Sequence, residues 1–221
     1  IGTVALPILI LIWPNQAGAA KQVVAFLLPL LCVMDIFAIF FYRRHIQWRR
    51  ILPIMPGTLV GVAAASLLFL RGENAVIALS DRWMKLAIGI IGLLFVLYQL
   101  VRSTLLKRLG NADTERWQVA LGFGITAGIT STVAHAAAPV AQMYFLPKRM
   151  EKMKFAATIA AFFFTLNLVK LVPFSLSGRI HIDNLLLAAV LLPLVPVGVA
   201  TGFLVVRVMK SQAYRLFIYT I

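Results

Sequence analysis

Long apolar runs separated by basic stretches constrain the fold of this chain more than any other feature. Hydrophobic residues make up 62% of its 221 residues, and charged residues only 13%. A soluble domain has about 45–50% apolar and about 25% charged residues, so a water-soluble fold could not bury this much apolar surface. The runs that approach the length of about 20 residues needed to cross the hydrocarbon core are Gln22–Tyr42, Ile51–Leu70, Met84–Val101, Phe155–Val172 and Leu185–Val208. We therefore expect an all-α polytopic protein of the cell inner (plasma) membrane.

Shorter segments surround these runs. Ile1–Trp13 is an incomplete apolar element, Glu73–Trp83 is amphipathic and suits the membrane interface, and Met209–Ile221 begins another apolar element. We interpret the chain as cut within membrane elements at both ends.

The net charge of +14 has a different meaning here than in a soluble protein. The Lys and Arg residues fall mostly between the apolar runs, which follows the positive-inside rule and favours contact with anionic lipid headgroups. We therefore expect the lipid bilayer, and no nucleic acid, as a partner. Cys32 is the only cysteine, so no internal disulfide can form, and its apolar surroundings favour a packing role.

One pattern occurs twice along the chain. Pro53–Gly57 and Pro193–Gly198 each open an apolar run, and a His-Ile pair precedes each of them. Such duplication is typical of transporters, so we predict two related repeats at residues 1–101 and 119–221, joined by a basic linker at 102–118. The first repeat would lack its N-terminal part and the second its C-terminal part. Chance similarity among Leu- and Ala-rich helices is the alternative.

The segment Val119–Leu146 is too long for one simple helix. Three glycines, several hydroxyl residues and Ala136–Pro139 interrupt it. Irregular backbone at membrane depth is tolerated only where protein or a cavity surrounds it, so we expect a discontinuous or re-entrant helix. If this segment enters the membrane and returns to the same side, the Lys- and Arg-rich stretches between the apolar runs all lie on the cytoplasmic side. The two repeats then have inverted orientations, as we expect. A single crossing would make the repeats parallel.

Polar residues within the apolar runs are the candidate site. Asp35 lies in mid-span, where it suits a proton carrier or charge partner, although a protonated Asp bonded to a neighbouring helix is equally consistent. Asn167 and Lys170 are three residues apart and share a helical face that could meet an anion. Lys170 could instead extend to the headgroups.

His135 and Thr132 precede the proline of the broken segment. Helix N–H groups and hydroxyls could converge there on an anion, with His135 adding a proton-dependent charge. A neutral His135 bonded to a carbonyl is the alternative. Because we find no metal-ligand spacing, phosphate loop or catalytic motif, we expect no metal, no cofactor and no enzyme activity.

Three motifs follow one another in the second half: Gly128–Pro139, Lys154–Thr158 and Asn167–Lys170. With these motifs the chain resembles the sulfite exporter TauE/SafE family of anion permeases. The resemblance covers nearly the whole chain and is less specific over Ile1–Leu70. It implies transport of small anions, among them sulfite, sulfonates and sulfur-containing organic acids, coupled to protons.

Many members of that family have glycines where this chain has Ala136, Ala137 and Ala138. Alanine disfavours left-handed backbone, so either the helix break is milder here or the substrate loop lies elsewhere.

These observations predict a transporter that passes a small anion by alternating access between two repeats. Its site would be Thr132, His135, Asn167 and Lys170 around the anion, with Asp35 as proton carrier or charge partner. A homo-oligomer is an open option. The alternatives are a non-transporting membrane subunit that packs against partner proteins and, less favoured because ionisable residues are sparse, an intramembrane enzyme.

Overall fold

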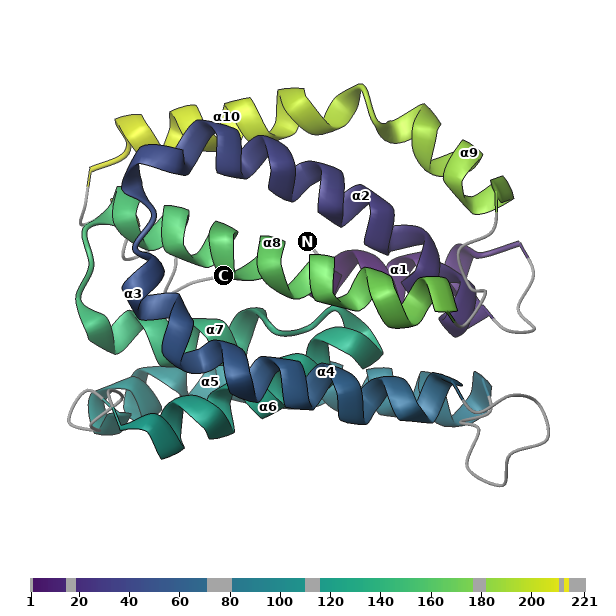
Figure 1. Ribbon diagram of the computed structural model, residues 1–221, viewed down its shortest axis with the longest axis horizontal. Coiled ribbons are helices and arrows are strands. Elements are labelled where there is room, and N and C mark those ends of the chain that lie inside the picture. The colour runs from purple at the N-terminus through teal and green to yellow at the C-terminus, as the bar shows by residue number, and fades with distance from the viewer. Residues whose placement is uncertain are drawn as a thin grey trace.

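The computed structural model describes residues 2–14, 19–70, 81–109, 116–176, 182–210 and 213–214, and every regular element within them is a helix (Figure 1). In chain order the elements are α1 (Gly2–Ile12), α2 (Ala19–Tyr42), η1 (Arg43–His45), α3 (Trp48–Ile51), η2 (Leu52–Ile54), α4 (Met55–Leu70), α5 (Asp81–Leu109), α6 (Trp117–Ala134), α7 (Ala138–Phe145), η3 (Leu146–Lys148), α8 (Lys152–Leu176), α9 (Ile182–Leu191) and α10 (Leu194–Val208).

Within the described residues, four helical stretches are long and apolar enough to cross a membrane. They are Ala19–His45, Trp48–Leu67, Lys152–Leu176 and Ala188–Val208. Large apolar side chains cover the outside of the bundle; Leu93 on α5 and Val208 on α10, for example, are 71% and 81% exposed. A surface of this kind suits lipid rather than water, and the predicted all-α polytopic membrane fold is confirmed.

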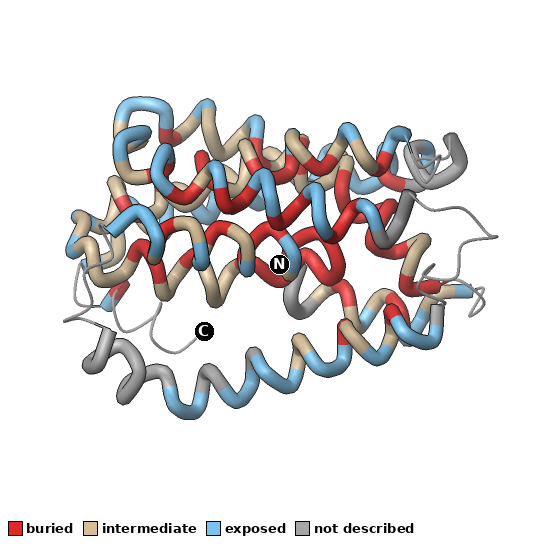
Figure 2. Tube along the Cα trace, turned by 60° about the horizontal axis from the view of Figure 1, so that its bottom comes forward, coloured by how far each residue is buried: buried red, intermediate tan, exposed pale blue. Residues whose placement is uncertain are grey.

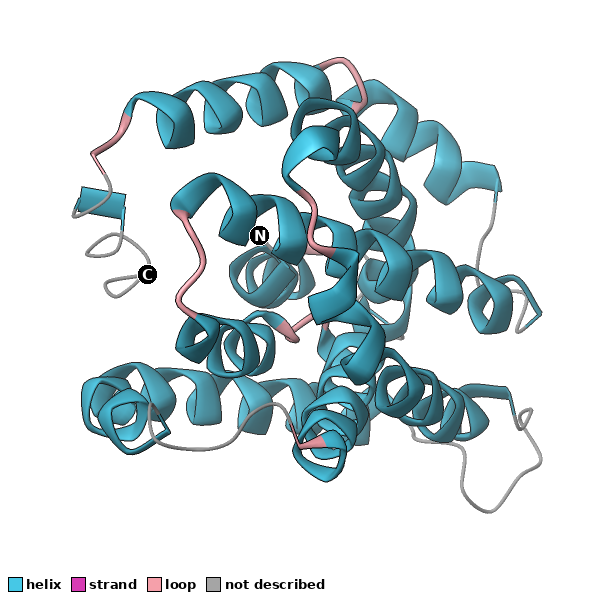
Figure 3. Ribbon diagram, turned by 60° about the vertical axis from the view of Figure 1, so that its left-hand side comes forward, coloured by secondary structure: helices cyan, strands magenta, loops and turns pink. Residues whose placement is uncertain are grey.

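Helix α8 runs through the middle of the bundle. Figure 1 places α2 and α10 on one side of α8, and α4, α5 and α6 on the other side. The most extensive packing joins α4 to α6 and α2 to α8. Figure 2 shows the buried residues gathered in the interior of the bundle, and Figure 3 shows short loops at the ends of helices. The polar residues of α2 and α8 therefore face each other inside the protein.

The crossing of α4 and α6 depends on glycine. A Cβ added to Gly61 would lie 2.2 Å from the carbonyl oxygen of Ile125, and one added to Gly128 would lie 2.5 Å from that of Thr58. Both helices thus carry a Gly-x-x-x-Gly pair, Gly57 with Gly61 and Gly124 with Gly128, that brings the two backbones into contact. The expectation that glycines interrupt this part of the chain is wrong, because α6 is continuous from Trp117 to Ala134. The glycines serve helix contact instead.

The predicted discontinuity lies just after α6. His135 adopts the left-handed conformation, with φ of 49°, and its N–H donates to the Ser131 carbonyl at 2.9 Å. This is the αL form of helix termination, and it separates α6 from α7. Ala137 keeps right-handed angles. The alanines are therefore not the left-handed residues; a histidine takes that position, and histidine is among the residues that tolerate it better than most.

Two elements differ from those expected. Helix α5 contains the predicted span Met84–Val101 but continues to Leu109, so the first half of the basic stretch is helical. In the crossing expected at Leu185–Val208, a turn next to Pro193 separates α9 from α10, because proline removes a helix hydrogen bond. Residues 71–80 and most of Met209–Ile221 lie outside the described residues, so the interfacial piece and the last element are not addressed.

Candidate functional site

The first polar contact of the interior joins α2 to α8. The Asn167 side chain donates from Nδ2 to Oδ2 of Asp35 at 2.7 Å. Both residues lie in the middle of their helices and are nearly inaccessible, at 3% exposure for Asp35 and 4% for Asn167. A buried carboxylate needs a donor of this kind, so the amide compensates part of its desolvation.

Lys170 lies one turn beyond Asn167 on the same face of α8, as the spacing of three residues predicts. Its side chain is fully buried, with 0% exposure, so the alternative that it extends to the headgroups is wrong. Its Nζ donates to Oγ of Ser131 at 2.9 Å, to the Ser131 carbonyl oxygen at 3.3 Å and to Nδ1 of His135 at 2.9 Å. All three partners belong to the C-terminal end of α6 and the break that follows it.

His135 extends this contact to α2. Its Nε2 lies 2.9 Å from the carbonyl oxygen of Val24. A carbonyl can only accept, so Nε2 carries the proton; an ammonium can only donate, so Nδ1 of the ring accepts from Lys170. The geometry therefore describes a neutral imidazole bonded to a carbonyl, which was the alternative to a charged His135. The ring ties the end of α6 to both α2 and α8.

Thr132 is buried but does not join this cluster. Its Oγ1 donates to the carbonyl oxygen of Gly128, one turn back in its own helix, at 2.8 Å. The hydroxyl that contacts Lys170 belongs to Ser131, which sequence reasoning missed. A signal was present, because Ser131 is four residues before His135 and therefore on the same helical face.

The arrangement thus holds one ammonium, one carboxyl, one amide, one hydroxyl and one imidazole inside the bundle. We call this group, Asp35, Ser131, His135, Asn167 and Lys170, the buried cluster. Asp35 and Lys170 lie within electrostatic range of each other, and Cys32 lies near both. The described residues include no group of three His, Cys, Asp or Glu that could hold a metal ion. The side chains of the buried cluster themselves offer charge and hydrogen bonding.

Comparison with known proteins returned one family match. A model of the family described as "Sulfite exporter TauE/SafE" matches residues 1–221, the whole chain. Neither the curated proteins nor the solved structures gave a match.

Proposed function

The chain belongs to the sulfite exporter TauE/SafE family, a family of membrane transporters, and from this premise we propose that it carries a small anion across the inner membrane, with the buried cluster as its binding site. The substrate class would be sulfite, sulfonates or other sulfur-containing organic acids, and transport would be coupled to protons.

The observation that carries this proposal is the complete burial of Lys170 in α8, a helix long and apolar enough to cross a membrane. A charged side chain at the centre of a spanning helix costs about 2.5–3.5 kcal/mol on insertion scales, so such residues usually serve a pathway. The three partners of Lys170, two oxygens and a ring nitrogen, are all neutral acceptors. An anion entering the site would replace one of them, and both partners of the new hydrogen bond would then be charged.

The charges of the cluster suggest how an anion and a proton would move together. With Lys170 protonated and Asp35 ionised, the cluster is neutral overall. A bound anion would add one negative charge, and an uncompensated charge in this interior is costly. Protonation of Asp35 would restore neutrality. Binding of the anion should therefore favour uptake of a proton by Asp35, and protonation of Asp35 should favour binding of the anion.

The same residues suggest where alternating access would act. Asp35 comes from residues 1–101, whereas Asn167, Lys170 and His135 come from residues 119–221. If these ranges are the two inverted repeats, the site lies where they meet, as in many transporters built from repeats. Thr132 would then serve the pathway only after a rotation that releases its hydroxyl from the Gly128 carbonyl.

Flux measurement on the isolated protein tests the proposal. Purified protein in liposomes should release sulfite or a sulfonate faster than protein-free liposomes, and an imposed pH gradient should change the rate. Sulfate and carboxylates tested alongside would define the substrate class. Absence of flux for every anion, with folded and inserted protein, would favour a non-transporting subunit.

Substituting Asp35 with asparagine tests the coupling. Asn is nearly isosteric, and its oxygen can still accept from Asn167, so the helix contact should survive. The variant should keep its fold yet lose the response to a pH gradient, because it has no proton to exchange. Glu151→Gln is the matched control, since Glu151 is exposed outside the bundle and bonded to Lys154. A full response to the gradient in Asp35→Asn would remove Asp35 from the coupling mechanism.

A further inference from the structure

A cavity lies away from the buried cluster, at one end of the bundle. Its volume is about 660 Å³, and it opens between the segment around α3 and the end of α7 with η3. The polar and aromatic residues that line it are Gln47, Trp48, Arg49, Arg50, Tyr144 and Lys148. Three of them are cationic, and none of the described residues that line the cavity is acidic. The cavity, which we call the basic pocket, therefore selects for a negatively charged occupant.

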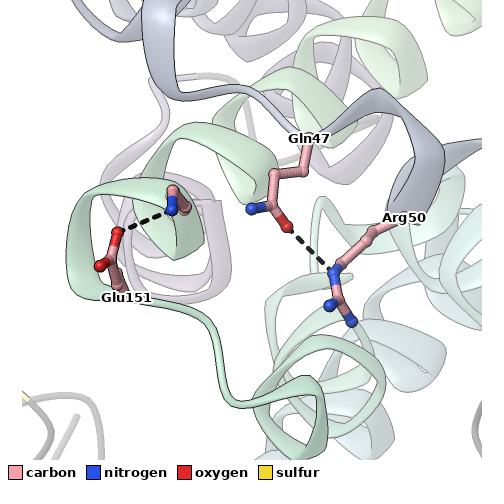
Figure 4. A network of polar contacts seen from close by, with 4 residues as sticks. Gln47, Arg50 and Glu151 are labelled. Carbon is pink, nitrogen blue, oxygen red and sulfur yellow. Dashed lines mark hydrogen bonds and ion pairs between the residues drawn. The ribbon is translucent and has the colours of Figure 1, made fainter.

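Contacts within the protein hold two of these cations in place. Arg50 donates from Nε to Oε1 of Gln47 at 3.0 Å (Figure 4), which leaves its two terminal nitrogens for an oxyanion. The ammonium of Lys148 lies 4.3 Å from the ring centroid of Tyr144, a cation–π contact on the wall of the pocket. Arg50 and Lys148 are both half-buried. A ligand would therefore lose little entropy in ordering them.

The nearest acidic residue in sequence does not cancel this charge. Glu151 follows Lys148 closely, but its carboxylate pairs with the ammonium of Lys154 at 2.9 Å. In Figure 4 a dashed line leads from the Glu151 carboxylate to the nitrogen of an unlabelled residue, apart from the Gln47–Arg50 pair. The hydrogen bond from Lys154 and the positive charge of Lys154 lower the pKa of Glu151, so this carboxylate remains ionised and paired with Lys154.

The outer edge of the pocket indicates which anion it meets. Trp48 is 49% exposed, and Leu52, one helical turn further, is 63% exposed. Tryptophan beside exposed leucine and arginine is typical of the headgroup level of a membrane. Basic pockets at this level bind the phosphates of lipid headgroups, and a volume of about 660 Å³ exceeds what a small inorganic anion fills. We propose that the basic pocket binds the phosphate headgroup of an anionic phospholipid, with Arg50 and Lys148 holding the phosphate and Trp48 lying beside the acyl chains.

Lipid binding to the purified protein tests this site without any transport measurement. Delipidated protein in detergent is titrated with phosphatidylglycerol or zwitterionic phosphatidylcholine, and native mass spectrometry counts the bound lipid. Arg50→Gln/Lys148→Gln should weaken phosphatidylglycerol binding about 30-fold, from about 1 kcal/mol for each basic residue near a lipid surface. The control Arg44→Gln/Arg149→Gln removes the same charge from exposed residues outside the pocket lining, and should change binding less than about threefold.

Three results would overturn the proposal: equal losses in the two double variants, equal binding of phosphatidylcholine, and displacement of the lipid by free sulfite or inorganic phosphate at matched concentration. The last result would assign the pocket to the soluble anion. The melting temperature without lipid shows whether each variant is folded. If Arg50→Gln/Lys148→Gln is unstable, Lys148→Gln alone should weaken binding about fivefold. Since the pocket shares no residue with the buried cluster, failure here leaves the transport proposal intact.

Discussion

Lys170→Met should lower anion flux by about 100-fold or more while the protein still folds and inserts. Lys170 is the cation that holds the end of α6, and it is fully buried. Methionine has a similar length, so the interior stays filled, but it offers no charge and no donor. Methionine leaves the buried Asp35 without its nearby positive charge, and removing one member of a buried charge pair costs about 3–5 kcal/mol. Protonation of Asp35 would relieve that cost, so flux is compared between folded and inserted samples only.

The matched control for this variant lies in the same helix. Lys154→Met removes an equal charge near the start of α8, where the side chain is 43% exposed and pairs with Glu151. Surface pairs of this kind contribute little, so flux should stay within about twofold of the unsubstituted protein. Initial rates in liposomes are compared at equal amounts of inserted protein, with the melting temperature of each variant measured in parallel. Normal flux in Lys170→Met would exclude Lys170 from the binding site, and equal losses in both variants would point to net charge instead.

Gly124→Ala should destabilise the protein by about 3 kcal/mol or more, the upper end of the range for overpacking. Its Cβ would lie 2.3 Å from the carbonyl oxygen of Ile54 and 2.7 Å from the amide nitrogen of Thr58. Both atoms belong to the α4 region backbone and cannot rotate away, so the helices must separate. Because α6 also carries Ser131 and is followed directly by His135, flux should fall with stability.

Gly122→Ala provides the control two residues earlier in α6. Nothing lies within 4 Å of the added Cβ, and alanine is the better helix former by up to about 1 kcal/mol, so this variant should be neutral or more stable. Equilibrium unfolding in mixed detergent micelles gives both free energies. Similar unfolding of the two variants would mean that α4 and α6 are not in backbone contact.

Much of the fold could be predicted from local pattern. The apolar runs predict the helices because each has the length and composition that lipid requires, and α2 and α8 match Gln22–Tyr42 and Phe155–Val172 to within a few residues. The glycines of α6 misled prediction because a Gly-x-x-x-Gly pair is consistent either with a weak helix or with a tight contact between two helices. Only a partner helix decides between them, and α4 supplies it with Gly57 and Gly61.

The candidate site, like the fold, could be predicted from the sequence only in part. Sequence alone determined that Asp35 and Asn167 must face away from lipid, since polar side chains at membrane depth are costly there, but it left open whether Lys170 extends to the headgroups. It could not determine their partners, because a helical pattern gives the face of a residue but not the helix opposite. The tertiary structure decided that Asn167 meets Asp35, that Lys170 meets Ser131 and His135, and that Thr132 bonds back to its own helix. Those contacts depend on how α2, α6 and α8 cross, which is set by packing among residues more than 30 positions apart in the chain.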